Sequence, residues 1–432
     1  MDKPTHLNPN LGSESYFYAS HLTSGCVPRF VATLRLGIDE DILRIALDDI
    51  QKRFPQMSVQ IQRTADGKNY ELIDNPRPIP IFTDNGSVIR TMGTEETNFH
   101  LVTITSYEKF MMFDFHHLLG DGTGFLIFMK AVVYHYLELR GVPLENDGTI
   151  LTVDQPVREE ESEDAYAKLM DVECSLPDWY KPGLEAFSIP VNTDDDPTDT
   201  VVQIRIPFNK FHEVFKSYHS TPVTFLSLVF SHAIYEQYRD TIGEKCIVAS
   251  VPVNLRPYYP TETLRYFITV ASLAHSKLFR KEDFAKQLLT QRELLSEQTQ
   301  PKVLTKLAQN HINGMKKFRE LDMTVEEKAK IMDSKVRSSM GTFTYVITNM
   351  GNVSFPESMS AYVDEFYPIL PTATCPFSIA TTTWKGELML SITQRSTDIT
   401  ICKRFVDMLN ELDVPAYLAD TFPFHTMRAK PL

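Results

Sequence analysis

The sequence predicts an α/β fold with mixed sheets, divided into two lobes of comparable length. With 432 residues, the chain is longer than a single hydrophobic core usually grows, so two lobes are expected. Strand-like and helix-like apolar patterns follow one another along the whole chain, without a strict strand–helix–strand repeat. An acidic stretch at residues 141–200 separates the two halves. We therefore expect one lobe at residues 1–140, another at residues 201–432, and a connection between them.

The first lobe is expected to open with a strand, a helix and a hairpin. Phe30–Leu36 is apolar and rich in residues that favour strands. Asp39 then stands at an N-cap position, and apolar residues recur at helical spacing over residues 39–54, until Pro55 ends the helix. Asp66-Gly67 marks a hairpin turn between two further alternating runs.

Two more strands and a second helix follow. The runs Phe99–Thr105 and Phe110–Phe115 flank a short turn and predict an antiparallel pair. The second run stops at His116, and apolar residues at helical spacing begin again at Phe125. A strand therefore ends, and a helix begins, within a few residues of one another in this part of the chain.

The connection is defined by its charge. Residues 141–200 hold 16 acidic and three basic residues, and the rest of the chain holds 40 of each, so this stretch carries the whole net charge of −13. It also contains several prolines and the run Asp194-Asp195-Asp196-Pro197. We interpret it as a partly mobile inter-lobe connection with a short helix around Ala165–Met170. A docking tail for a basic partner is the functional alternative.

The second lobe is expected to mix strands and helices in the same way. Its predicted strands are Val201–Ile206, Cys246–Val253, Phe267–Leu273, Thr342–Thr348, and a hairpin of Phe377–Trp384 and Glu387–Thr393 around Lys385-Gly386. Its predicted helices are Val223–Tyr238, opened by Thr221 and Pro222, a helical region at 281–334 interrupted at Asn313-Gly314, and Ile399–Leu412.

Composition argues against several classes of function. The net charge of −13 speaks against a general nucleic-acid or anionic-membrane surface, which would need clustered Lys and Arg. Integral membrane association is not expected, because the strongest apolar stretches, such as Phe225–Phe230, are too short to span a bilayer. Met1–Ser13 carries no apolar signal core. Five scattered cysteines without metal or redox spacing predict reduced thiols in a cytoplasmic protein.

The most informative run is His116-His117-Leu118-Leu119-Gly120-Asp121-Gly122, at the end of an apolar strand. Adjacent residues on a strand point to opposite faces, so one imidazole can face a cleft and take a proton from a hydroxyl or amine. The aspartate on the following turn can lock the local geometry by pairing with a cation. A histidine satisfied in the core is the alternative. No metal site is predicted, because adjacent side chains diverge and no third ligand stands at a recognisable spacing.

This run resembles the HHxxxDG signature of the chloramphenicol-acetyltransferase-like superfamily. The closest members in character are the alcohol O-acetyltransferases, the polyketide-associated acyltransferases and the condensation domains. Three other elements of the chain resemble the family's and stand in its order: Arg53-Phe54-Pro55, the Asn-Leu-Arg end of Val251–Pro257, and Thr348–Val353, which is similar to an SNLG element. The resemblance covers most of the chain apart from the acidic stretch.

The resemblance implies two chloramphenicol-acetyltransferase-like lobes with an active-site channel between them. It implies acyl transfer from a coenzyme A or carrier-protein thioester to a small alcohol, less readily to an amine, with acyl-CoA as co-substrate and no permanently bound cofactor. His117 would be the general base, with His116 as its supporting neighbour, and no acyl-enzyme would form. Asp121 would be structural and held by Arg256, while Gly122 would admit the thioester and offer its N–H to the oxyanion.

Weaker candidates for substrate contact come from three other places. They are Tyr18, which stands near the N-terminus with Tyr16 and His21, Asn349 of the SNLG-like element, and Thr381, Thr383 and Trp384, where relatives carry a Thr/Ser-Trp element. Ordinary hairpin residues are the alternative for the last three. The chain departs from the family at Arg265-Tyr266-Phe267, where many relatives carry a Gly-Asn pair, and this bears on how the donor is recognised.

Two other functions stay open at this stage. A stand-alone condensation-type enzyme would form an amide on a carrier protein. A non-catalytic scaffold of the same fold would have kept the motif only for folding. The intact imidazole of His117 beside Asp121 and Gly122 counts against the scaffold, because folding alone does not need it.

Overall fold

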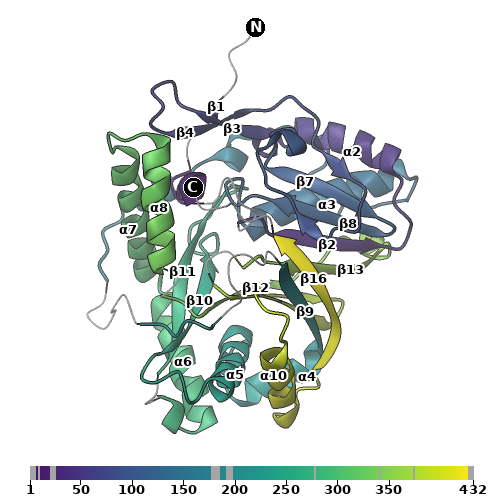
Figure 1. The fold of residues 1–432 in the computed structure, drawn as a ribbon. Coiled ribbons are helices and arrows are strands. Elements are labelled where there is room, and N and C mark those ends of the chain that lie inside the picture. The colour runs from purple at the N-terminus through teal and green to yellow at the C-terminus, as the bar shows by residue number, and fades with distance from the viewer. Residues whose placement is uncertain are drawn as a thin grey trace.

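The strands of this protein form three sheets in two lobes (Figure 1). The computed structural model describes residues 6–7, 10–19, 26–176, 185–190, 198–276, 279–339, 342–372 and 375–426. The two larger sheets combine parallel and antiparallel neighbours, and helices pack against them, which confirms the predicted mixed α/β class.

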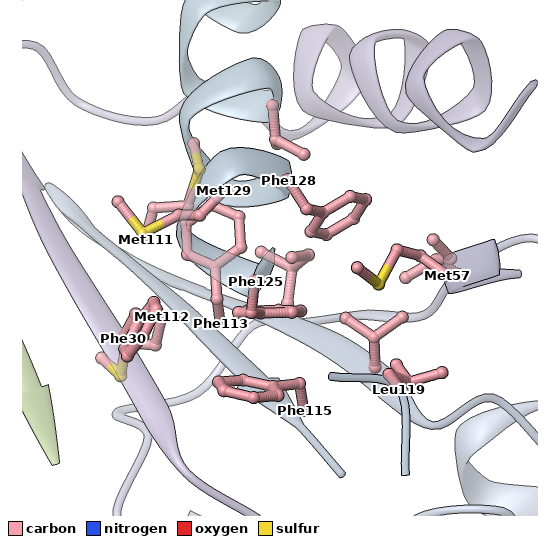
Figure 2. Close-up of a cluster of buried hydrophobic side chains, with 14 of the residues drawn as sticks. Phe30, Met57, Met111, Met112, Phe113, Phe115, Leu119, Phe125, Phe128 and Met129 are labelled. Atoms are coloured by element: carbon pink, nitrogen blue, oxygen red, sulfur yellow. The ribbon is translucent and has the colours of Figure 1, made fainter. Parts of the chain in front are cut away.

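The first lobe is built on a five-stranded sheet. Its strands are, in spatial order, β13 (Val363–Ile369), β2 (Arg29–Leu34), β8 (Phe110–Phe115), β7 (Val102–Tyr107) and β5 (Ile81–Phe82). Helices α2 (Glu40–Arg53) and α3 (Gly122–Leu139) pack on each other beside it. Figure 2 shows the buried aromatic and methionine side chains of this core, where the rings of Phe115 and Phe125 stack with centroids 3.7 Å apart. This stack fixes the end of β8 against the start of α3.

The boundaries of α2 follow from local sequence, as predicted. The Asp39 side chain accepts a hydrogen bond from the Ile42 backbone N–H at 3.1 Å and so caps the helix. Buried residues recur at helical spacing along α2, and the helix ends before Pro55. The next strands, β3 (Val59–Arg63) and β4 (Tyr70–Asp74), form the predicted hairpin, and β1 (His6–Leu7) pairs with β4 to complete a three-stranded sheet.

The second lobe is built on an eight-stranded sheet. Its spatial order is β11 (Ile268–His275), β10 (Ile247–Asn254), β12 (Tyr345–Asn352), β14 (Phe377–Trp384), β15 (Glu387–Gln394), β9 (Thr198–Pro207), β16 (Tyr417–Thr426) and β6 (Val88–Ile89). The accompanying helices are α4 (Phe208–Ser217), α5 (Pro222–Gln237), α6 (Phe284–Gln298), α7 (Pro301–Arg319) and α10 (Thr400–Glu411). Helix α8 (Val325–Ser339) follows α7 in the chain and packs against α1 (Tyr16–Ala19), and its Val325 and Met332 are buried in the first-lobe core. Among the described residues, no helix combines the length and the apolar character needed to cross a bilayer.

The two lobes exchange strands, which the sequence does not predict. β13 follows β12 in the chain but pairs antiparallel with β2 at the edge of the first sheet. β6 lies early in the chain but pairs with β16, which Figure 1 shows in yellow running towards the upper lobe. Pro368 in β13 and Pro423 in β16 interrupt the apolar alternation that marks a strand. The lobe limits at residues 140 and 200 stay a prediction.

The predicted interruption of the helical region at Asn313-Gly314 is wrong. Helix α7 runs through both residues, because Leu304, Ala308, Ile312 and Met315 keep one buried face. Burial of this face outweighs the roughly 1 kcal/mol that a glycine costs relative to alanine inside a helix. The breaks instead fall just before Pro301 and between α7 and α8.

The described part of the acidic connection is anchored to both lobes. It contains two short 3-10 helices, Glu159–Ser162 and Ala165–Leu169, the second close to the predicted helix. Both carboxylate oxygens of buried Glu161 accept hydrogen bonds from Arg53 at 2.8 Å. The Glu161 carbonyl also accepts a bond from the Leu264 backbone N–H at 2.9 Å. One residue of the connection therefore joins α2 to the second lobe.

Candidate active site

The two adjacent histidines leave β8 in different directions. His116 is fully buried, and its Nδ1 accepts a hydrogen bond from the Leu118 backbone N–H at 3.2 Å. His117 is partly exposed, and its backbone N–H donates to the Cys26 carbonyl at 3.1 Å. The alternation of side chains at the strand end thus places the His116 imidazole wholly in the core and leaves His117 as a partly exposed residue.

The hydrogen bonding of His117 fixes its tautomer. Its Nδ1 lies 3.1 Å from the Gly120 carbonyl oxygen, which can only accept, so Nδ1 carries the hydrogen. The lone pair is then on Nε2, and within the described residues nothing donates to it. Burial lowers the pKa of His117, while the bond to Gly120 and the charge of Asp121 act in the opposite direction with smaller effect. The ring is therefore a neutral base at physiological pH.

Three aromatic rings surround this imidazole. Tyr16, from the short helix α1 (Tyr16–Ala19), stacks on it with centroids 5.6 Å apart and an angle of 16°. Tyr266 of the second lobe meets it edge-on at 5.8 Å, and so does Phe115 at the end of β8. The hydroxyl oxygens of Tyr16 and Tyr266 are 3.3 Å apart. Segments from the N-terminus and from both lobes therefore meet at His117.

Asp121 uses both carboxylate oxygens within the protein. Its Oδ1 accepts from the backbone N–H groups of Thr123 and Gly124, at 3.0 and 3.1 Å, and so caps α3. Its Oδ2 accepts from Arg256 Nη1 at 2.7 Å and from the Phe267 backbone N–H at 2.8 Å. The structure thus places Asp121 and Arg256 in the contact that the resemblance implied, and the carboxylate is fully engaged away from any substrate.

Arg256 directs most of its remaining donors to one short loop, while Nη1 also donates to Asn254 Oδ1 at 3.2 Å. Its Nε and Nη2 donate to the Thr263 carbonyl at 3.2 and 3.0 Å, and Nη2 also donates to the Arg265 carbonyl at 2.7 Å. Such a charge-assisted, multiply bonded guanidinium holds the geometry of the loop. Arg256 and Asp121 together lock residues 263–267 of the second lobe onto the start of α3.

The three glycines of the motif region have different surroundings. A Cβ on Gly120 or Gly124 would lie 2.5 or 1.9 Å from the Leu264 carbonyl oxygen, so both glycines permit the backbones of the two lobes to touch. A Cβ on Gly122 would meet only Phe30 and Met350, at 3.7 and 3.8 Å, which are ordinary contact distances. Gly122 is the first residue of α3, where backbone N–H groups lack helical partners.

The described contacts of Tyr18 and Trp384 are with residues other than His117. Tyr18 is buried, donates to Asn69 Oδ1 at 3.1 Å and packs edge-on against Phe318. Trp384 is buried in the first-lobe core and donates to the Asp364 carbonyl at 3.0 Å. Neither side chain is directed at the imidazole by these contacts, and Tyr16, two residues before Tyr18, is the one that stacks on it. His21 lies outside the described residues.

Asn349, Thr381 and Thr383 lie on neighbouring strands of the second sheet. Asn349 on β12 is exposed, and its Oδ1 accepts from Thr381 Oγ1 of β14 at 3.0 Å. Thr383 on β14 is buried, and its carbonyl accepts from the Val353 N–H at 3.0 Å. Asn349, Thr381 and Thr383 therefore stay predicted substrate contacts.

A cavity lies beside the histidine motif. Its walls come from the N-terminal segment and from Tyr70–Leu72 of β4, together with Leu118 and Arg265, and do not include His117. The predicted channel through His117 therefore stays a prediction. The contact of Tyr266 with His117 was not predicted. In the sequence, Arg265-Tyr266-Phe267 is only a departure from the family's pattern, and a single tyrosine in a loop carries no further signal.

Comparison with known proteins identifies the fold. No protein-family model matches the chain, and no curated protein matches it in sequence. Polyketide synthase associated protein 5 from Mycobacterium tuberculosis is similar over 95% of this chain and 99% of that one, with a TM-score of 0.58 and 13% identity. The epimerization domain from the third module of tyrocidine synthetase B covers 95% and 96%, with a TM-score of 0.60 and 12% identity.

A third solved structure carries a bound thiol cofactor. It is F. sporotrichioides TRI101 complexed with coenzyme A and T-2, which is similar over 96% of this chain and 100% of that one, with a TM-score of 0.57 and 10% identity. At these identities the likeness shows the fold: the chain has the two-lobed fold of condensation domains and acetyltransferases. The resemblance seen in the sequence is confirmed at this level.

Proposed function

We propose that this protein is an acyltransferase that moves an acyl group from a coenzyme A or carrier-protein thioester to the hydroxyl of a small acceptor. The observation that carries the proposal is His117, a partly exposed neutral imidazole with its tautomer fixed by Gly120 and its Nε2 lone pair unused within the described residues. The fold supports it, since solved structures of this fold include a trichothecene 15-O-acetyltransferase and TRI101 complexed with coenzyme A.

In this proposal each residue of the site has a distinct role. Nε2 of His117 takes the proton of the acceptor hydroxyl, whose oxygen attacks the thioester carbonyl carbon directly. The carbon–sulfur bond then breaks, and the imidazolium returns the proton to the departing thiolate. Gly122 offers a backbone N–H at the positive end of α3 to the developing oxyanion. Asp121 and Arg256 are positioning residues, because all their described bonds are internal.

Amide formation on a carrier protein is the second candidate. It is favoured by the likeness to the condensation domain from Monacolin K polyketide synthase MokA, with a TM-score of 0.57 and 13% identity. The same base would then take a proton from an amine. The two candidates differ in acceptor and in donor carrier, so one assay can separate them.

The proposal is tested by following free-thiol release. The purified protein is incubated with acyl-CoA thioesters of increasing chain length, each with a panel of alcohols and amines, and in parallel with acyl groups on a carrier protein. Thiol release that depends on an alcohol supports O-acyl transfer from coenzyme A. Release only from the carrier with an amine favours the second candidate. Absence of release in every combination would leave the protein as a scaffold of this fold.

The dependence of activity on pH is a further expected result. A general base works in its neutral form, so kcat/KM should fall as the pH drops through the pKa of His117. Burial lowers this pKa, so the acidic limb should lie below the usual histidine value of about 6.5. This is checked by measuring kcat/KM for the alcohol between pH 4.5 and 8, with the acyl-CoA kept at a saturating concentration. A limb centred above neutrality would contradict an imidazole whose pKa is lowered by its surroundings.

A further inference from the structure

Hydrogen bonds hold the backbone of Tyr266 and of the residues before and after it. The carbonyl of Arg265 accepts from Arg256, the N–H of Phe267 donates to Asp121, and the carbonyl of Tyr266 itself accepts from Asn10 Nδ2 at 3.0 Å. Hydrogen bonds to the backbone of three successive residues hold this loop more firmly than is usual for a surface loop. They also fix the direction of the Tyr266 side chain. That side chain is the ring that meets His117 edge-on.

The hydroxyl of Tyr266 can donate its hydrogen to a further acceptor when Tyr16 is the donor of the bond between them. It lies 3.3 Å from the Tyr16 hydroxyl, and a bond between two hydroxyls uses only one of their two hydrogens. With Tyr16 donating, Tyr266 keeps its own O–H, and within the described residues this hydroxyl has no other hydrogen-bond partner. Burial raises the pKa of both phenols, so both stay protonated at neutral pH. A neutral donor is thus fixed beside the base.

We propose that the Tyr266 hydroxyl donates a hydrogen bond to the thioester carbonyl oxygen as that oxygen becomes an oxyanion, and that Asp121 and Arg256 serve to place Tyr266. This inference rests on the acyl transfer proposed above and adds a second donor to the N–H of Gly122. The Asp121–Arg256 pair then contributes to the reaction by positioning Tyr266, since it forms hydrogen bonds with the backbone of Arg265 and Phe267 on either side of it.

The step balances without any further reactant. The acceptor O–H proton moves to Nε2 of His117 as the carbon–oxygen bond forms, and the carbonyl π electrons move onto the oxygen that Tyr266 contacts. When the carbonyl re-forms, the carbon–sulfur bond breaks and the thiolate receives the proton from the imidazolium. Tyr266 keeps its own hydrogen throughout. It stabilises charge only in the transition state, so its loss should lower kcat rather than raise KM.

The decisive variant is Tyr266→Phe, which keeps the ring and removes the hydroxyl. We expect kcat to fall on the order of 10- to 100-fold, with both KM values within about twofold of wild type. The acidic limb of the pH profile should not move, because the ring that buries His117 remains. Tyr16→Phe should have a smaller effect on kcat, since it removes the partner hydroxyl and not the donor.

A matched control removes a buried hydroxyl elsewhere. Tyr345 lies in the second-lobe core, with its hydroxyl 2.8 Å from Ser227 Oγ and 3.0 Å from Ser231 Oγ. Tyr345→Phe should lower the melting temperature and leave kcat unchanged. If Tyr266→Phe turns over like wild type while activity still depends on His117, the inference is overturned and the proposed function stands. If wild type releases no thiol, the proposed function fails first and the inference with it.

Discussion

Replacing His117 with alanine is expected to lower kcat by roughly two to four orders of magnitude, the usual effect of removing a positioned base. The reason is that Nε2 is the only ring atom left for the acceptor proton, because Nδ1 is bound to the Gly120 carbonyl. The turnover of wild type and variant is compared with the best acyl-CoA and alcohol of the panel. Added imidazole should restore part of the activity, because a small base can enter the space that the ring leaves.

A second substitution separates chemistry from loop structure. The side-chain amide of His117→Asn can still donate to the Gly120 carbonyl, yet it offers no basic nitrogen. It should therefore fold like wild type and be as inactive as the alanine variant. His212→Asn, on the exposed face of α4 and away from the site, controls for the loss of a histidine and should keep full activity. Wild-type rates in both His117 variants would reject the general-base assignment.

Gly124→Ala is expected to have the largest effect on stability. The new methyl carbon would lie 1.9 Å from the carbonyl oxygen of Leu264 and 2.9 Å from its Cα, so backbone rather than a side chain must move. The Leu264 backbone is itself fixed by its N–H bond to Glu161. We expect the free energy of unfolding to fall by ~3 kcal/mol or more, or the soluble yield to collapse.

The control for this substitution lies two residues earlier. A methyl group on Gly122 would make only ordinary contacts with Phe30 and Met350, and alanine favours a helix over glycine. Gly122→Ala should therefore unfold in urea at the wild-type midpoint or slightly above it. Equal denaturation midpoints for Gly124→Ala and wild type would show that the two lobes do not rely on the close approach of Leu264 to α3.

Much of the fold follows from local sequence. Asp39 and Pro55 set the limits of α2, and Lys385-Gly386 sets a hairpin whose two residues both adopt positive φ. These elements could be predicted because their signals lie within a few residues. The pairing of β13 with β2 could not, since its partners are more than 300 residues apart and Pro368 weakens the strand pattern.

The candidate site divides in a similar way. His117, Asp121 and Gly122 stand in one short run, so their proximity is a local property that a motif can reveal. Tyr266 reaches the imidazole only because residues of the second lobe bind back to α3, and no spacing in the chain encodes this. The sequence also cannot tell which of Tyr16 and Tyr18 contacts His117. The direction of α1 in the structure decides this, and it places the Tyr16 ring on the imidazole.

The exchange of β13 and β6 limits how the molecule can open. Backbone bonds from each of these strands cross from one half of the chain to the other, so a wide hinge movement would have to break both sets of ladder pairs. If the lobes stay paired, two substrates reach the imidazole through small local movements of the segments around it. Fragments cut within the acidic connection should, for the same reason, refold only in each other's presence.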